Sequence, residues 1–113
     1  MELRAYAALF FYGKVIDMFD AQQFQVIAQL SPRAQQVVGF IMWMDSPARE
    51  IVLPRSQFYA RLHFYPRNEN MMAIQKAVAD VVEEVRAALL PHLNIRIGDN
   101  DLGEQEQLFT ITY

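Results

Sequence analysis

The chain of 113 residues contains no cysteine, so neither a disulfide framework nor a thiolate metal site can form. This absence is compatible with an intracellular setting. The longest apolar runs, such as Val37 to Met44, fall far short of the ~20 residues that a bilayer-spanning helix needs. The first residues also lack a charged-then-apolar leader with a small-residue cleavage site. We therefore expect a cytoplasmic protein that is neither secreted nor embedded in a membrane.

The short motifs that carry catalysis are missing as well: there is no glycine-rich phosphate loop, no Gly-x-Ser-x-Gly elbow and no His-Glu-x-x-His helix. Glu83 and Glu84 are adjacent, so on a helix they point about 100° apart and cannot act as an opposed pair. The acidic stretch from Asp99 to Glu106 does not have the spacing of an EF-hand loop, which favours a solvated hairpin loop. His63 and His92 lack a companion carboxylate at a metal-binding interval. We expect no enzyme, no cofactor and no metal site.

What the chain does contain is typical of one packed domain spanning residues 1–113. Apolar residues make up 53% of it and charged residues 20%, a composition that argues against disorder. Large rings are numerous for a domain of this size, and some of them are expected at a subunit interface, where aromatic residues are enriched. These rings are Phe10, Phe11, Phe19, Phe24, Phe40, Trp43, Phe58, Phe64 and Phe109.

The formal net charge of −3 counts against a nucleic-acid binder, whose affinity depends on neutralising phosphates. The charge is unevenly distributed, however. The segment from Arg49 to Lys76 carries a net charge of +3, whereas the segment from Asp80 onward carries −5. A basic middle segment is therefore followed by an acidic C-terminal third.

Two helix starts are readable in the first half of the chain. Asp20 can act as the N-cap of a helix that has Phe24, Ile27 and Leu30 at helical spacing. Ser31 followed by Pro32 is a stronger start, because serine accepts a bond from the first turn and proline has a preset φ. This second helix runs through the apolar stretch from Val37 to Met44. Over Leu9 to Ile16 the pattern does not separate strand from helix, and we favour a strand.

A strand, two helices and a hairpin are expected in the second half. Glu50 to Leu53 is β-rich, and a helix follows from Arg55 or Ser56 to about Leu62. Asn68 is predicted to cap a long helix of about 22 residues that ends at Pro91. Two alternating strands, which include Leu93 to Ile97 and Phe109 to Tyr113, then form a hairpin around the acidic connector.

This order of elements resembles the winged helix-turn-helix domains of plasmid and phage replication initiators. The resemblance covers about two thirds of the chain and lies in degenerate hydrophobic patterns. It implies an α+β fold: a winged helix-turn-helix with an N-terminal strand and helix extension and a C-terminal β-hairpin wing. The segments that carry it are Lys14–Asp17, Leu30–Gln35, Ile51–Leu62 and Asn70–Val78.

In such domains the second helix of the motif enters the major groove, and a β-hairpin wing follows. The resemblance implies that Arg67 could contact guanine or phosphate, Asn68 or Asn70 could contact adenine, and Arg55 and Ser56 could hold the DNA backbone. Other readings of the same residues remain open, because surface cations are often only solvated and Asn68 also fits an N-cap. The candidate DNA-binding residues are Arg55, Ser56, Arg61, Arg67, Asn68, Asn70 and Lys76.

The sequence thus predicts a homodimer that binds double-stranded DNA and acts in replication, partition or transcriptional control. The alternative is a protein-interaction or assembly component that does not bind DNA. A phage structural subunit, or an acidic inhibitor of a nucleic-acid-binding protein, would use the acidic C-terminal third as its contact surface. Salt-dependent binding to DNA distinguishes the two hypotheses.

Overall fold

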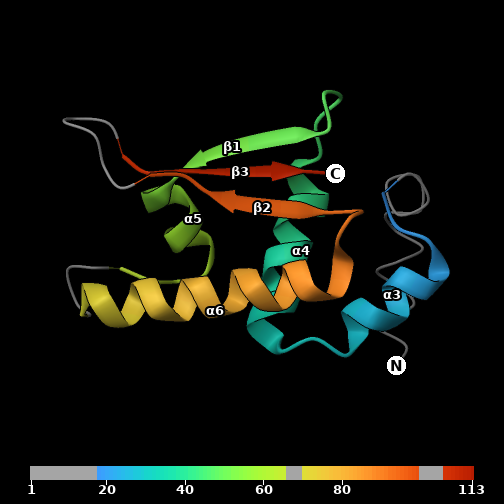
Figure 1. Ribbon diagram of the computed structural model, residues 1–113, viewed down its shortest axis with the longest axis horizontal. Coiled ribbons are helices and arrows are strands. Elements are labelled where there is room, and N and C mark those ends of the chain that lie inside the picture. The colour runs from blue at the N-terminus through green and yellow to red at the C-terminus, as the bar shows by residue number, and fades with distance from the viewer. Residues whose placement is uncertain (1–17, 66–69, 100–105) are drawn as a thin grey trace.

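The computed structural model describes residues 18–65, 70–99 and 106–113. It has an α+β fold in which a sheet forms one side of the molecule and α6 runs along the other, with α4 and α5 reaching between them (Figure 1). The elements are α3 (Ala21–Ala28), α4 (Pro32–Met44), β1 (Glu50–Pro54), α5 (Arg55–Arg61), α6 (Met71–Leu89), β2 (Asn94–Ile97) and β3 (Leu108–Thr112).

Both predicted helix starts in the first half are confirmed. The Asp20 carboxylate accepts a hydrogen bond from the Gln23 backbone, and the Gln23 side chain accepts one from the Asp20 backbone in return. Ser31 caps α4 by accepting from the Ala34 backbone, with Pro32 as the first helical residue. The proposed strand over Leu9 to Ile16 lies outside the described residues.

The predicted start of the long helix is wrong by two residues. Asn70, rather than Asn68, is the N-cap of α6, and its side-chain oxygen accepts from Met72 N at 2.8 Å and Ala73 N at 3.2 Å. The helix has 19 residues instead of about 22. Two asparagines lie near the start of the same apolar repeat, and the repeat alone could not show which of them the first turn would bind.

The three strands form an antiparallel sheet in the order β1-β3-β2, so the last strand lies between the other two. Ile51 is opposite Ile111, which is opposite Ile95 on the other side. These three isoleucines are buried, while Val52, on the opposite face of β1, is exposed. The sheet therefore has one apolar face toward the helices and one face toward solvent, as the alternating pattern predicts.

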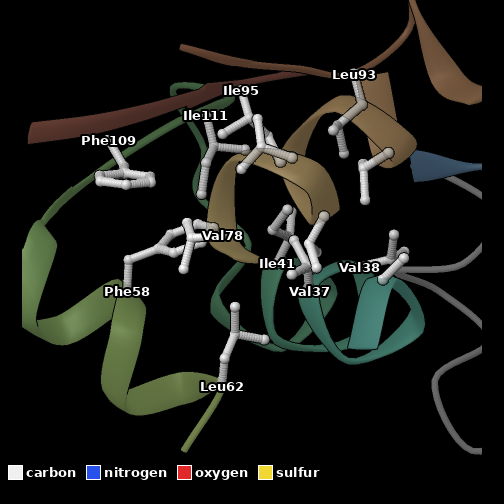
Figure 2. Packing of buried hydrophobic residues seen from close by; sticks show 14 of the residues in the cluster. Val37, Val38, Ile41, Phe58, Leu62, Val78, Leu93, Ile95, Phe109 and Ile111 are labelled. Atoms are coloured by element: carbon white, nitrogen blue, oxygen red, sulfur yellow. The ribbon is translucent and has the colours of Figure 1, made fainter. Parts of the chain in front are cut away.

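The core lies between that apolar face and the helices. Figure 2 shows the side chains of α4, α5 and α6 meeting those of the sheet. Phe58 of α5 stacks on Phe109 of β3 with ring centroids 4.3 Å apart. Most of the Phe and Trp rings in the described residues are buried or half-buried in this way, so they are not left over for an interface. Trp43 is the exception among these two residue types, with 66% of its surface exposed. Phe10 and Phe11 lie outside the described residues.

Helix α6 has one buried side, formed by Ile74, Val78 and further apolar residues to Leu89. Met71 is half-buried against the core, as expected of a methionine that fills a gap. The adjacent Met72 also belongs to an apolar run, which predicts a core side chain; this prediction is wrong, because the Met72 side chain is 78% exposed. An amphipathic helix has room for only one apolar stripe, and Met72 lies outside it.

Candidate nucleic-acid interface

The candidate site is the end of the molecule that holds α5, the first turns of α6 and the start of β3. These parts lie in the same half of the long axis in Figure 1. The chain enters α5 directly from β1, and Arg55 N donates to the Gln107 carbonyl at 2.8 Å, which attaches the start of α5 to the residues before β3. The arrangement positions α5 between the sheet and α6.

Ser56, a predicted contact to the DNA backbone, is held by a carboxylate of this chain. Its backbone N–H donates to Glu106 Oε1 at 2.9 Å, and its hydroxyl donates to Glu106 Oε2 at 3.0 Å. Residue 54 is a proline and gives α5 no side-chain cap, so Glu106 supplies one from 50 residues away. A phosphate could use these two donors only after Glu106 had moved.

Asn70, a predicted reader of adenine, also has a structural role. Its side-chain oxygen already accepts two backbone N–H groups of α6. Reading adenine with a paired donor and acceptor needs that same oxygen. Capping therefore competes with base recognition at Asn70. Arg67 and Asn68 lie outside the described residues.

Lys76 and Arg61 remain accessible for contacts to phosphate. Lys76 Nζ lies 3.3 Å from Asp80 Oδ2 one helical turn later, and both side chains are mostly in solvent. Exposed ion pairs of this kind contribute little to stability, so Lys76 could exchange Asp80 for a phosphate at little cost. Arg61 is exposed at the last residue of α5.

Sequence reasoning missed Arg33, which the fold brings to the same region. Its guanidinium lies 4.4 Å from the centroid of the Phe64 ring, just beyond α5. One turn further along α4, Gln36 Nε2 donates to the carbonyl of Arg61 at 2.9 Å. The spacing of Arg33 and Gln36 on one helix face was the available signal, but their partners are about 30 residues away in the sequence. An open hollow of about 550 Å³ is lined by Ser31, Pro32, Arg33, Gln36, Ala77, Asp80 and Val81.

Glu84 is the second residue whose role the sequence did not indicate. Its carboxylate accepts from the Ser31 backbone N–H at 2.8 Å and from the Ser31 hydroxyl at 2.7 Å, in a part-buried position. These bonds attach the start of α4 to the middle of α6. Glu84 is therefore occupied in holding two helices together, and Glu83 beside it is exposed.

The two halves of α6 differ in charge. Between Met71 and Ala79 the helix contains no acidic residue and has Lys76 on its surface. From Asp80 onward it contains Asp80, Glu83 and Glu84 against Arg86. Because phosphates repel carboxylates, only the first half of this helix suits a close approach to DNA.

Candidate metal sites and membrane-spanning helices are absent from the described part of the chain. No group of three or more His, Asp or Glu side chains is placed there to hold a metal ion. None of the helices in residues 18–65, 70–99 and 106–113 has the length and apolar character needed to cross a membrane. Compared with known proteins, the chain matches no family model, no curated protein and no solved structure.

Proposed function

We propose that this chain is a winged helix-turn-helix domain that binds double-stranded DNA as a homodimer. The process served would be replication, partition or transcriptional control of a plasmid or phage, as the sequence resemblance implies. The observation that carries the proposal is the order α4, β1, α5, α6, β2, β3 combined with the sheet order β1-β3-β2. In a winged helix, a short strand likewise precedes the helix-turn-helix, and a hairpin wing follows.

Within this proposal α5 and α6 are the two helices of the motif, and α6 enters the major groove. Strands β2 and β3 belong to the wing. Arg61 and Lys76 contact phosphates from either side of the turn between the helices, and Arg33 adds a third cation nearby. A dimer doubles this modest charge and binds two half-sites about one helical turn apart.

Binding to mixed-sequence duplex DNA, measured by fluorescence anisotropy over a salt series, tests the proposal. We expect the affinity to fall steeply with salt, and Lys76→Ala and Arg61→Ala each to reduce the salt slope by about 1, as the loss of one phosphate contact does. Arg96→Ala is the matched control, because it removes the same charge from the exposed face of β2. Absence of binding at low salt would overturn the proposal, and an equal effect of Arg96→Ala would overturn the placement of the interface.

A second function, protein interaction without DNA, is favoured by a different surface. Val52 and Leu108 are exposed on the outer face of the sheet, and Trp43 is exposed near the end of α4. Tryptophan in particular is enriched at protein–protein interfaces. If DNA binding is absent and the mass in solution is that of a larger oligomer, this second function replaces the first. Substitutions of Trp43 and Val52 by serine then reduce the mass, whereas Lys76→Ala does not.

A further inference from the structure

The exposure of Met72 is not explained by the fold alone. It is a large apolar side chain on the first turn of α6, and 78% of its surface is exposed. Gln75 and Ala79, three and seven residues later, are exposed as well. Positions at this spacing lie along one side of a helix. The three residues therefore form a neutral strip, which we call the α6 strip, beside the charged Lys76.

The dimensions of the α6 strip fit the edges of a few base pairs. Seven residues of helix span about 10.5 Å, and base pairs are stacked about 3.4 Å apart. The major groove, ~12 Å wide, admits an α-helix. The strip also lies wholly within the half of α6 that contains no acidic residue, while Asp80 and Glu83 follow directly after it. Charge thus restricts the approach to DNA to the part of the helix that carries the strip.

Resting on the proposed DNA binding, we infer that the α6 strip reads A·T base pairs in the major groove. The Gln75 amide donates to N7 and accepts from the N6 amino group of an adenine. Met72 and Ala79 pack on thymine methyl groups, which no other base carries. Asn70 does not take this role, because its oxygen caps the helix. The occupant of this helix face is therefore duplex DNA with A·T pairs at the positions under Met72, Gln75 and Ala79.

The first test selects bound sequences from a random duplex pool with the full chain and with Gln75→Ala. We expect the wild-type chain to enrich an adenine at one position, and Gln75→Ala to reduce that preference by at least about fivefold. Its affinity for mixed-sequence DNA and its salt slope stay unchanged. The matched control is Gln25→Ala, which makes the same substitution at an exposed position of α3 and leaves the preference intact.

The second test replaces thymines of the selected site by uracil, which removes only the methyl group. We expect replacement of the thymine under Met72 to weaken wild-type binding about fourfold, the effect of losing one buried methyl contact. Met72→Ala should bind the sites with thymine and with uracil at that one position equally. Because Met72 is exposed, this variant should fold normally, and an unchanged thermal midpoint checks that it does.

The outcomes separate this inference from the proposed function. Salt-dependent binding with no sequence preference, or with the same preference in Gln75→Ala, overturns the reading by the α6 strip and leaves DNA binding in place. If the uracil effect persists in Met72→Ala at every thymine of the site, the methionine contact is overturned. No binding of any duplex at low salt overturns both.

Discussion

Two serine and glutamate pairs in this molecule have the same geometry in different surroundings. In each of them a carboxylate accepts from the N–H and the hydroxyl of one serine, with distances from 2.7 to 3.0 Å. The pair of Ser31 and Glu84 is part-buried between α4 and α6, whereas the pair of Ser56 and Glu106 is exposed beside the proposed interface. At the first position this arrangement holds two helices together. At the second position we expect an external anion to be able to replace the carboxylate.

Burial explains why the two pairs should differ in energy. A hydrogen bond to a charged group contributes more where water cannot replace the lost partner. Ser31 also caps α4 with its own oxygen, so Glu84 completes a chain of bonds that includes Ala34. Ser56 has water within reach. We expect the pair between the helices to determine stability and the exposed pair to affect binding.

The largest effect is expected from Glu84→Ala. It leaves the N–H and hydroxyl of Ser31 without their acceptor in a part-buried place, and we expect the free energy of unfolding to fall by about 2–3 kcal/mol. Urea denaturation followed by circular dichroism measures the change. Glu83→Ala is the control, because the Glu83 carboxylate is exposed and its contact to Arg86 Nη1 is long, at 3.8 Å. An equal loss in both variants would contradict the role of the Ser31 contact, and helix propensity could not explain such a loss because alanine is the better helix former.

Tyr113→Phe should give an intermediate effect and extends the comparison to a third hydroxyl. The Tyr113 hydroxyl donates to Asp45 Oδ1 at 2.7 Å and accepts from Ser46 N at 2.6 Å, which fastens β3 to the end of α4. Removing it should cost about 1 kcal/mol of unfolding free energy at pH 7. The exposed Tyr65 offers the control substitution Tyr65→Phe, which should cost nothing measurable.

The stability that Tyr113 contributes should depend on pH. Burial raises the pKa of Tyr113 above its usual value of 10.0. The fold therefore binds this proton more tightly than the unfolded chain does, and the stabilisation is complete below pH 10 and is lost as the pH rises through the raised pKa. The stability difference between wild type and Tyr113→Phe should shrink over that range. A difference that is constant up to high pH would contradict the assignment.

The smallest effect on stability, less than about 0.5 kcal/mol, is expected from Glu106→Ala. Its effect should appear in DNA binding instead, as a few-fold gain in affinity at low salt, because the variant removes a negative charge and exposes the two donors of Ser56. Glu50→Ala removes the same charge from the exposed face of β1 and serves as the control. If Glu106→Ala weakens binding, Ser56 and Glu106 act together in positioning α5, and competition with phosphate is wrong.

Local pattern was enough to predict most helices and strands. The helix starts could be predicted from Asp20, Ser31 and Pro32, because a cap is made between residues a few positions apart. The alternation in β3 likewise indicates that Phe109 and Ile111 face the core. In β1 three apolar residues follow one another, and only the structure shows that Val52 is the exposed one. At the start of α6 this local information was ambiguous, since Asn68 and Asn70 both fit a cap. Geometry at the first turn decided for Asn70.

The candidate site was less predictable, because its contacts join distant segments. Ser56 fits a phosphate contact in the sequence, and only the fold brings Glu106 to it from 50 residues away. The spacing of Arg33 and Gln36 was the local signal in α4, but only the fold brings Phe64 to Arg33. Met72 belongs to an apolar run in the sequence and yet lies in solvent, since the axis of α6 relative to the sheet decides which stripe is buried.

The sequence by itself determined the α+β class, the order of the elements, most helix caps and the two faces of the sheet. These features depend on residues within a few positions of one another, or on a period of 2 or 3.6. Tertiary structure alone decided the sheet order β1-β3-β2, the two serine and glutamate pairs, and the side of α6 that is left exposed. Those features depend on which distant segments pack together, and packing is a property of the whole chain.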